Sequence, residues 1–183
     1  MLALYTGCRR GELCALKWHD FIMTDKYRCV LTVSRSRSHI PGQDVMEGPT
    51  KNGHSRTIVI EEDITSLLLG YCSYKTAQAE KVGRKVSPYL FVDEYGHFIH
   101  PDTFTKHLRK IFRENDFPES FHLHTLRHYV ISSLLHPGVD KQTVAEIAGH
   151  ADTSFLERTY CHLQMELKKQ AANVMTDVLL HSA

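Results

Sequence analysis

Residues 6–13, with the sequence TGCRRGEL, decide how the rest of the chain is interpreted. An apolar run precedes this stretch, Gly7 interrupts it, and apolar residues recur at helical spacing from Leu13 onward, so the pattern predicts a helix, a turn and a second helix. Glu12 follows Arg9 by three residues, which is within reach across one helical turn. The stretch therefore predicts an arginine that a neighbouring carboxylate orients.

Three further groups of polar residues follow along the chain. They are TKNGHSR at residues 50–56, HTLRH at residues 124–128, and Gly149-His150, which precedes Tyr160 by ten residues. Arginine stays charged and donates two parallel hydrogen bonds to phosphate, whereas tyrosine, with an ordinary pKa of about 10, must lose its proton to attack. This set suits cleavage of a phosphodiester through a phosphotyrosine, with fixed cationic donors in place of a metal ion. We therefore expect neither a cofactor nor a metal.

The order of these groups resembles the catalytic domain of the tyrosine recombinases, the family of lambda-type integrases and Xer-type recombinases. The resemblance runs from about residue 4 to residue 163 and includes Leu16-x-Trp18-x-Asp20. Ala148 stands where a leucine is more usual, which we interpret as a packing variation. The resemblance implies six catalytic residues: Arg9, Lys51, His124, Arg127, His150 and Tyr160.

The resemblance also implies a role for each of these residues. The two arginines would bind the phosphate, and the histidine at position 124 would act near the phosphate and the tyrosine. His150 would donate a hydrogen bond to a phosphate oxygen, and Lys51 would protonate the leaving 5′ oxygen. Tyr160 would be the nucleophile that forms a 3′-phosphotyrosine.

Length and composition predict one domain. With 183 residues and 42% hydrophobic content, the chain can bury a substantial core. The sequence begins inside an apolar run without a capping residue, so we expect residues 1–183 to be a catalytic domain that lacks the family's N-terminal core-binding domain. Its first residues are too short and too quickly polar for a signal peptide or membrane span, so a soluble, cytoplasmic protein without a membrane partner is expected.

Hydrophobic periodicity predicts an α+β fold, mostly helical with a small antiparallel sheet or hairpin. Strands are expected at residues 27–33 and 56–60, a long exposed loop between them, a hairpin at 90–99, and helices at 61–78, from 101, at 126–135 and at 140–148. Thr125 is the expected N-cap of the helix at 126–135, and Asp140 is the expected N-cap of the next helix. Gly149 is the expected left-handed residue after that helix. A capping box at residues 154–157 predicts a short helix that carries Tyr160, followed by an amphipathic segment at 164–180.

The charge of the chain is modest for a protein that binds nucleic acid. Its net charge is +1, although Arg35 and Arg37 are expected in one loop and further basic residues cluster at 81–85 and 106–113. The five cysteines are scattered without a Cys-x-x-Cys pair, which favours reduced thiols. We also expect no His-x-x-x-His pair on one helix face, so a histidine-rich metalloenzyme is a weakly supported alternative.

The leading interpretation is a site-specific DNA recombinase or integrase. Its expected partners are double-stranded DNA at recombination sites and further copies of itself, associated through the C-terminal helix into the tetramer that the resemblance implies. A type IB topoisomerase would use similar chemistry, but residues 6–13 and the Gly149-His150 pair look more like the recombinases. The alternative from another class is a truncated, non-catalytic integrase fragment that binds DNA or a partner without cutting.

Overall fold

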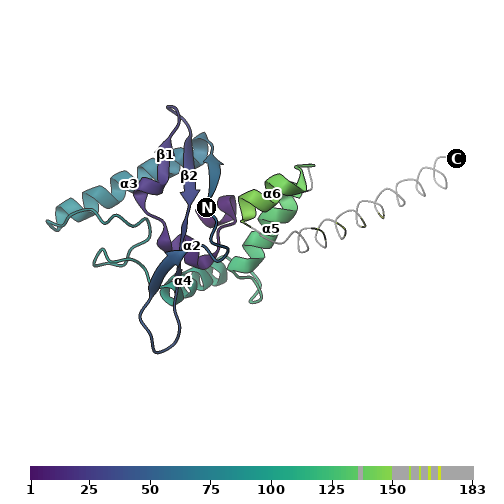
Figure 1. Cartoon of the computed structure of the whole chain (residues 1–183). Coiled ribbons are helices and arrows are strands. Elements are labelled where there is room, and N and C mark those ends of the chain that lie inside the picture. The colour runs from purple at the N-terminus through teal and green to yellow at the C-terminus, as the bar shows by residue number, and fades with distance from the viewer. Residues whose placement is uncertain (136–137, 150–156, 158–160, 162–164, 166–168, 170–183) are drawn as a thin grey trace.

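The computed structural model describes residues 1–135, 138–149, 157, 161, 165 and 169. The strands follow one another along the chain between two groups of helices, an α+β arrangement as the sequence predicts (Figure 1). The elements are α1 (Leu2–Thr6), α2 (Arg10–Ala15), the 3-10 turn η1 (Trp18–Asp20), β1 (Phe21–Met23), β2 (Cys29–Val33), β3 (Arg35–Ser38), β4 (Met46–Pro49), β5 (Arg56–Ile60), α3 (Glu62–Lys81), α4 (Pro101–Glu114), α5 (Leu123–Leu135) and α6 (Lys141–Ala148).

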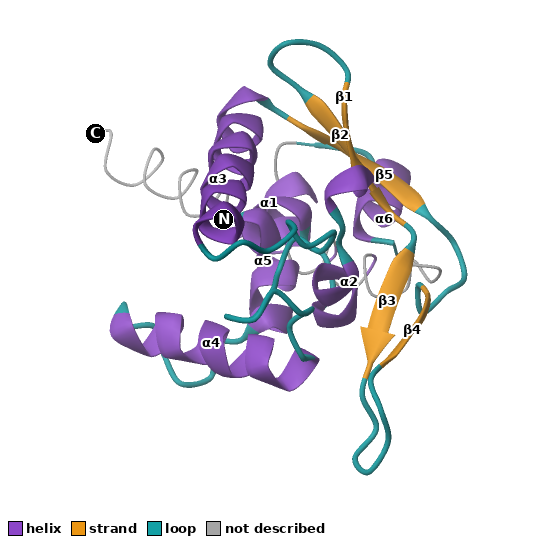
Figure 2. Ribbon diagram, turned by 90° about the vertical axis from the view of Figure 1, so that its left-hand side faces the viewer, coloured by secondary structure: helices purple, strands orange, loops and turns teal. Residues whose placement is uncertain are grey.

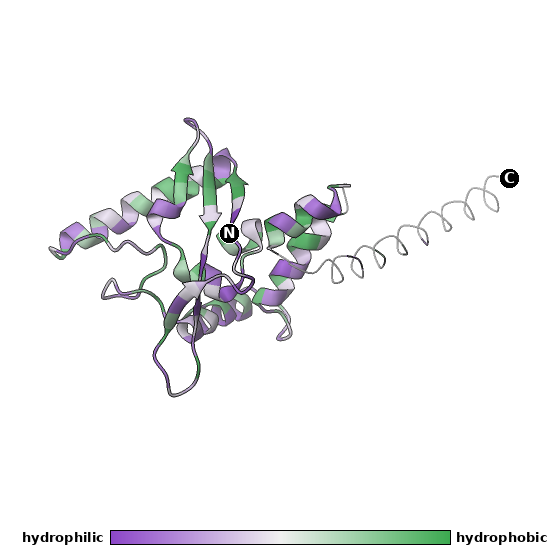
Figure 3. Cartoon of the chain, viewed as in Figure 1, coloured by the Kyte–Doolittle hydropathy of each residue, from purple (hydrophilic) through white to green (hydrophobic). Residues whose placement is uncertain are grey.

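The main sheet is antiparallel, with strand order β1-β2-β5. Alternate residues of β2 are buried, because successive side chains of a strand point to opposite faces. Leu31 lies opposite Phe21 on one side and Ile58 on the other, and helix α3 adds Ile64 to the same core. Figure 3 shows the hydrophobic residues that these strands contribute. The prediction of a strand at 56–60 is confirmed, and the strand expected at 27–33 begins two residues later, at Cys29.

Strands β3 and β4 form a second, two-stranded sheet, so the prediction of a long exposed loop between the strands at 27–33 and 56–60 is wrong (Figure 2). Ion pairs stabilise this hairpin: Arg35 binds Asp20 at 2.6 Å and Arg37 binds Glu47 at 2.7 Å. The two arginines are therefore paired within the fold and do not form an exposed basic loop. Gly11 of α2 lies against β3, where a Cβ atom would be 2.4 Å from the carbonyl oxygen of Arg37.

Helices α5 and α6 pack together around a separate apolar cluster that includes Ile131, Leu135 and Val144. The expected Asp140 cap is confirmed, since its carboxylate accepts a hydrogen bond from the Thr143 amide at 3.0 Å. Gly149 ends α6 in the left-handed conformation, at φ 63°, as predicted.

The predicted start of α5 is wrong by one turn. Helix α5 begins at Leu123, and the amide of Leu126 donates to the carbonyl of His122 at 3.2 Å. Thr125 lies inside the first turn, where its hydroxyl accepts a hydrogen bond from the His122 amide at 3.4 Å. The threonine side chain thus accepts a hydrogen bond from the amide of His122 before the helix, although Thr125 itself lies inside the helix.

Helix α4 begins at Pro101, as predicted. Phe112 is buried against Phe117 and Phe121, whereas Ile111, which the periodicity places on the buried face, is 53% exposed. The basic residues of this helix are all exposed: Lys106, Arg109, Lys110 and Arg113.

Three of the five cysteines, Cys8, Cys14 and Cys29, are buried and unpaired, which agrees with the expectation of reduced thiols. Among the helices that the structure describes, none is long and apolar enough to cross a membrane.

Candidate active site

A buried carboxylate, Glu12, joins two arginines at the start of α2. Its oxygens accept hydrogen bonds from the amide and the Nη1 atom of Arg9 at 2.8 and 2.9 Å. They also accept hydrogen bonds from both Nη atoms of Arg56, at 3.1 and 2.7 Å. The prediction that Glu12 orients Arg9 is confirmed. Arg56, the last residue of the TKNGHSR group, is a residue of this site that was not predicted.

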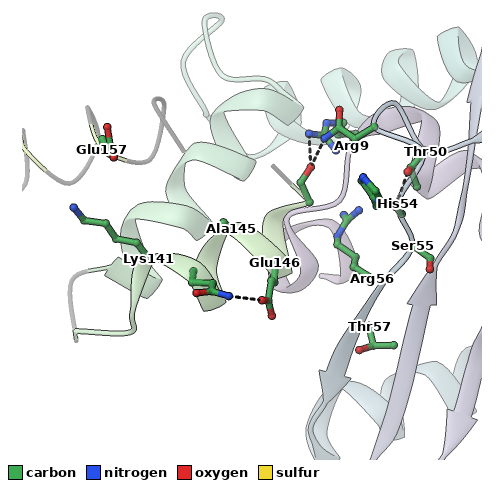
Figure 4. A pocket seen from close by; sticks show the side chains of 13 residues that line it. Arg9, Thr50, His54, Ser55, Arg56, Thr57, Lys141, Ala145, Glu146 and Glu157 are labelled. Atoms are coloured by element: carbon green, nitrogen blue, oxygen red, sulfur yellow. Dashed lines mark hydrogen bonds between the residues drawn. The ribbon is translucent and has the colours of Figure 1, made fainter. Parts of the chain in front are cut away.

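The C-terminal end of α6 is held by three arginines. The carbonyl of Ile147 accepts a hydrogen bond from Arg56 Nε at 2.8 Å, and the carbonyl of Ala148 accepts one from Arg127 Nη2. The carbonyl of Gly149 accepts a hydrogen bond from Arg9 Nη2 at 2.9 Å (Figure 4). The last carbonyls of a helix lack partners within the helix and carry its negative dipole end, so they are natural acceptors for cations. Arg9 and Arg127, which are 118 positions apart (127 − 9), therefore meet at one place.

Arg127 is a buried cation with neutral partners. It is 6% exposed, and its Nη1 atom donates to the carbonyl of Gly7 at 2.5 Å. Within the part of the chain that the structure describes, no carboxylate forms an ion pair with it. Burial and then the charge of Arg9 lower the pKa of Arg127 to about 10, so it stays protonated at neutral pH.

Two of the three arginines, Arg9 and Arg56, bind the same carboxylate, that of Glu12. Burial opposes the ionised form of Glu12, but hydrogen bonds from Arg56 and Arg9 outweigh this and lower the Glu12 pKa. Burial likewise opposes the charged form of Arg56, but the hydrogen bonds with Glu12 outweigh this and raise the pKa of Arg56. Three guanidinium charges and one carboxylate leave the site with surplus positive charge. Such a site favours an anion.

A cleft of about 740 Å³ lies between α6 and the segment at residues 50–57 (Figure 4). Arg9 and Arg56 line it, together with Asn52, whose side-chain amide donates to the Gly149 carbonyl at 3.0 Å. The cleft is open enough to admit a phosphate to the Arg9 side of the arginine group. Arg127 lies on the buried side and does not line the cleft.

The structure places the six predicted residues as follows. Arg9 and Arg127 come together at the end of α6. Lys51 is exposed in the turn at residues 51–53, beside Asn52, and does not line the cleft. His124 is exposed in the first turn of α5. His150 and Tyr160, with the capping box and the amphipathic segment, lie outside the described residues.

His124 stands among other basic groups. Partial loss of hydration, followed by the charges of His122, His128 and Arg127, lowers its pKa. A neutral imidazole can accept a proton, so this shift keeps His124 in the form a general base requires. His124 and His128 are four residues apart on α5, so the expectation that no His-x-x-x-His pair lies on one helix face is wrong.

One group of described residues has the composition of a metal site: His39, His100 and Asp102, whose ligand atoms lie within 4.8 Å of one another. His39 Nδ1 is 3.1 Å from a carboxylate oxygen of Asp102, and Arg10 donates to the other oxygen at 3.1 Å. Hydrogen bonds and the charge of Arg10 account for this arrangement without an ion. The group shares no residue with the arginine site.

Family comparison decides what kind of protein carries this arginine site. Residues 1–166 match the model of the phage integrase family. The chain belongs to this family of tyrosine recombinases. It is 28% identical to the ICEBs1 integrase of Bacillus subtilis (strain 168), over 97% of this chain and 48% of that protein. It is 25% identical to a tyrosine recombinase XerC-like protein of Caldanaerobacter subterraneus subsp. tengcongensis, over 98% of this chain and 49% of that one. The chain thus spans about half the length of these phage integrase family relatives.

Solved structures show the same fold. The Tn1549 transposon integrase in complex with transposon right end DNA matches with a TM-score of 0.73 and 17% identity, over 93% of this chain and 57% of that chain. The XerA recombinase matches with a TM-score of 0.66 and 22% identity, over 93% and 55% of the two chains. At these identities the similarity establishes the phage integrase family fold and nothing finer.

We expect anions to stabilise the protein through the arginine site. Sulfate or phosphate should raise the melting temperature, because a ligand at 100 times its Kd adds about 2.7 kcal/mol to the free energy of unfolding. Arg9→Met, which removes the guanidinium that lines the cleft, should lose most of the shift that a thermal melt measures at constant ionic strength. Arg28→Met, which breaks an exposed ion pair with Glu61, should keep it. An equal shift in both variants would mean that sulfate acts on the whole surface instead.

The buried Glu12 carboxylate predicts an acid-dependent loss of stability. Its pKa in the folded protein is below the ordinary 4.5, so its stabilisation is complete above pH 4.5 and is lost as the pH falls through the folded-state pKa. Urea unfolding at a series of pH values should therefore show that the difference between wild type and Glu12→Gln shrinks below pH 4.5. A difference that is constant with pH would contradict the ionised, arginine-bound state of Glu12.

Proposed function

We propose that residues 1–183 are the catalytic domain of a site-specific DNA recombinase or integrase that cleaves and rejoins double-stranded DNA through a 3′-phosphotyrosine. The observation that carries the proposal is the meeting of Arg9 and Arg127, with surplus positive charge, at the end of α6 directly before His150. Membership of the phage integrase family and the DNA-bound Tn1549 integrase structure support DNA as the partner.

The proposed reaction is an in-line displacement at phosphorus. The oxygen of Tyr160 forms a bond to the phosphorus, and the bond from phosphorus to the 5′ oxygen breaks. His124 accepts the phenol proton and Lys51 supplies a proton to the departing 5′ oxygen. Arg9, Arg127 and His150 meet the charge that develops on the non-bridging oxygens. One phosphodiester replaces another, so the reverse attack by a 5′ hydroxyl rejoins the strand without a nucleotide cofactor.

A nicked suicide substrate tests the proposal. Cleavage next to the nick releases a short fragment that carries the free 5′ hydroxyl. When this fragment diffuses away, the enzyme should remain covalently attached to the DNA and migrate as a larger species in a denaturing gel. DNA binding without any covalent species would support the alternative, a non-catalytic integrase fragment. The low net charge of +1 supports this alternative, because it gives little general attraction to DNA and so favours a fragment that binds a partner.

We propose further that the segment at residues 164–180 joins copies of the protein on DNA. Its apolar stripe needs a surface to cover it, and the family resemblance implies a neighbouring copy in a tetramer. Deletion of residues 165–183 should weaken cooperative assembly, measured by gel shift on DNA with two sites, more than cleavage of a nicked substrate. Intact assembly with lost cleavage would instead make the segment a support for its own active site.

A further inference from the structure

Arg56 occupies the space between the main sheet, α2 and α6. It is the first residue of β5, where it pairs with Val33, and its side chain is 7% exposed. From there it makes a two-pronged contact with the Glu12 carboxylate and donates through Nε to the Ile147 carbonyl at 2.8 Å. Arg56 thus connects three elements that are distant in the sequence.

Gly149 is fitted to this arginine. A Cβ atom at Gly149 would lie 2.7 Å from Nη1 of Arg56, closer than nonbonded atoms approach. Gly149 also has φ 63°, which a side chain disfavours. The turn after α6 therefore rests directly on the Arg56 guanidinium, one residue before His150.

Arg56 also completes the surroundings of Arg9. Glu12 is 1% exposed and accepts two hydrogen bonds from each of Arg9 and Arg56. Without Arg56, the carboxylate would keep Arg9 as its only guanidinium partner among the described residues and could turn toward it. The direction of Arg9, which also donates to Gly149, would then no longer be fixed from both sides.

We propose that Arg56 is a positioning residue for strand cleavage. It fixes the Glu12 carboxylate, and through Glu12 it fixes the Arg9 guanidinium against the end of α6. This inference rests on the proposed function, since Arg9 would bind the phosphate under attack. Arg56 itself needs no contact with DNA in this role. The planar guanidinium of arginine suits this role because it can donate to a carboxylate and to a carbonyl at the same time. The single ammonium group of lysine cannot do so in the same geometry.

Two substitutions and a matched control test the inference. Arg56→Met keeps an unbranched apolar side chain without the charge and the hydrogen-bond donors, and Arg56→Lys keeps the charge without the guanidinium. The control is Arg35→Met, which breaks another largely buried pair, with Asp20, in a different part of the fold. All three should lose stability, so each is assayed well below its own melting temperature.

The first measurement is single-turnover cleavage of the nicked substrate at saturating DNA. We expect the rate constant to fall 10- to 100-fold in Arg56→Met and less in Arg56→Lys, because misplacement of a substrate-binding group costs rates of this order. The Kd for DNA should stay within about twofold of wild type, and Arg35→Met should cleave at the wild-type rate. Equal rates in Arg56→Met and Arg35→Met would overturn the inference.

The second measurement needs no reaction. In protein labelled with ¹⁵N-arginine, the guanidinium resonances of Arg9, assigned through Arg9→Lys, should report restricted rotation in wild type and Arg35→Met. They should report free rotation in Arg56→Met. Unchanged Arg9 resonances in Arg56→Met would overturn the positioning role. A wild-type protein that forms no covalent DNA species would instead overturn the proposed function, and the resonances would still decide whether Arg56 positions Arg9.

Discussion

Replacement of Tyr160 by phenylalanine should abolish the covalent protein–DNA species completely. The substitution removes one hydroxyl, and without that oxygen no phosphotyrosine can form, whatever the state of the arginine site. Binding to the nicked DNA should be unchanged, because the phosphate contacts that supply most affinity come from other residues. The measurement is a denaturing gel with labelled DNA, accompanied by a gel shift for binding.

Tyr129 provides the matched control. It is 62% exposed on α5, two positions after Arg127, so Tyr129→Phe removes a comparable hydroxyl from a tyrosine that is not part of the proposed site. Tyr129→Phe should form the covalent species at the wild-type rate. If instead Tyr160→Phe still attaches to DNA and Tyr129→Phe does not, the nucleophile has been assigned to the wrong residue.

Loss of Arg127 should have the second largest effect. Arg127→Ala removes a buried cation and leaves two carbonyls, of Gly7 and Ala148, without their donor. By analogy with the removal of one donor from an oxyanion hole, the rate constant for cleavage should fall by about 10²- to 10³-fold. Arg127→Lys should recover only part of this, because one ammonium group cannot reproduce the fork. Single-turnover kinetics on the nicked substrate measure the effect.

The stability of the variant must be separated from its chemistry. Each carbonyl left without a partner costs about 1–3 kcal/mol, so Arg127→Ala should also melt at a lower temperature. Arg28→Ala, which removes an exposed arginine of the Arg28–Glu61 pair, is the control for loss of charge alone. Cleavage by folded Arg127→Ala at the rate of Arg28→Ala would refute a role for Arg127 at the phosphate.

Local signals made several elements predictable. The Asp140 cap and Gly149 fix both ends of α6, because each acts on the backbone next to it. The spacing of Glu12 and Arg9 predicted their pairing for the same reason. The β3–β4 hairpin could not be predicted in this way. Its first strand has the sequence RSRS, without apolar alternation, and its stability comes from carboxylates at positions 20 and 47.

The candidate site divides along the same line. Motif order identified Arg9 and Arg127, but the neighbouring carbonyls that accept from them, those of Gly149 and Ala148, reach them only through tertiary structure. Arg56 was missed because an arginine side chain is seldom buried unless it is paired, so its residue type argued against a place in the core. The available signal was its position directly before the alternating strand residues 57–60, which places it at a strand start with one side facing the core.

The hydrogen bonds at the end of α6 have a consequence for the order of folding. Arg9 reaches Gly149 across 140 positions, Arg127 reaches Gly7 across 120, and Arg56 reaches Ile147 across 91. Contacts so distant in sequence form late, since the entropy of closing the intervening chain must be paid first. During synthesis, Arg9 and Arg56 emerge long before residues 147–149, and until those carbonyls arrive the arginines cannot be gathered around one point. A growing chain therefore contains the arginines of this site before the site exists. The site forms only when residues 7–12 and Arg56 come together with Arg127 and residues 147–149.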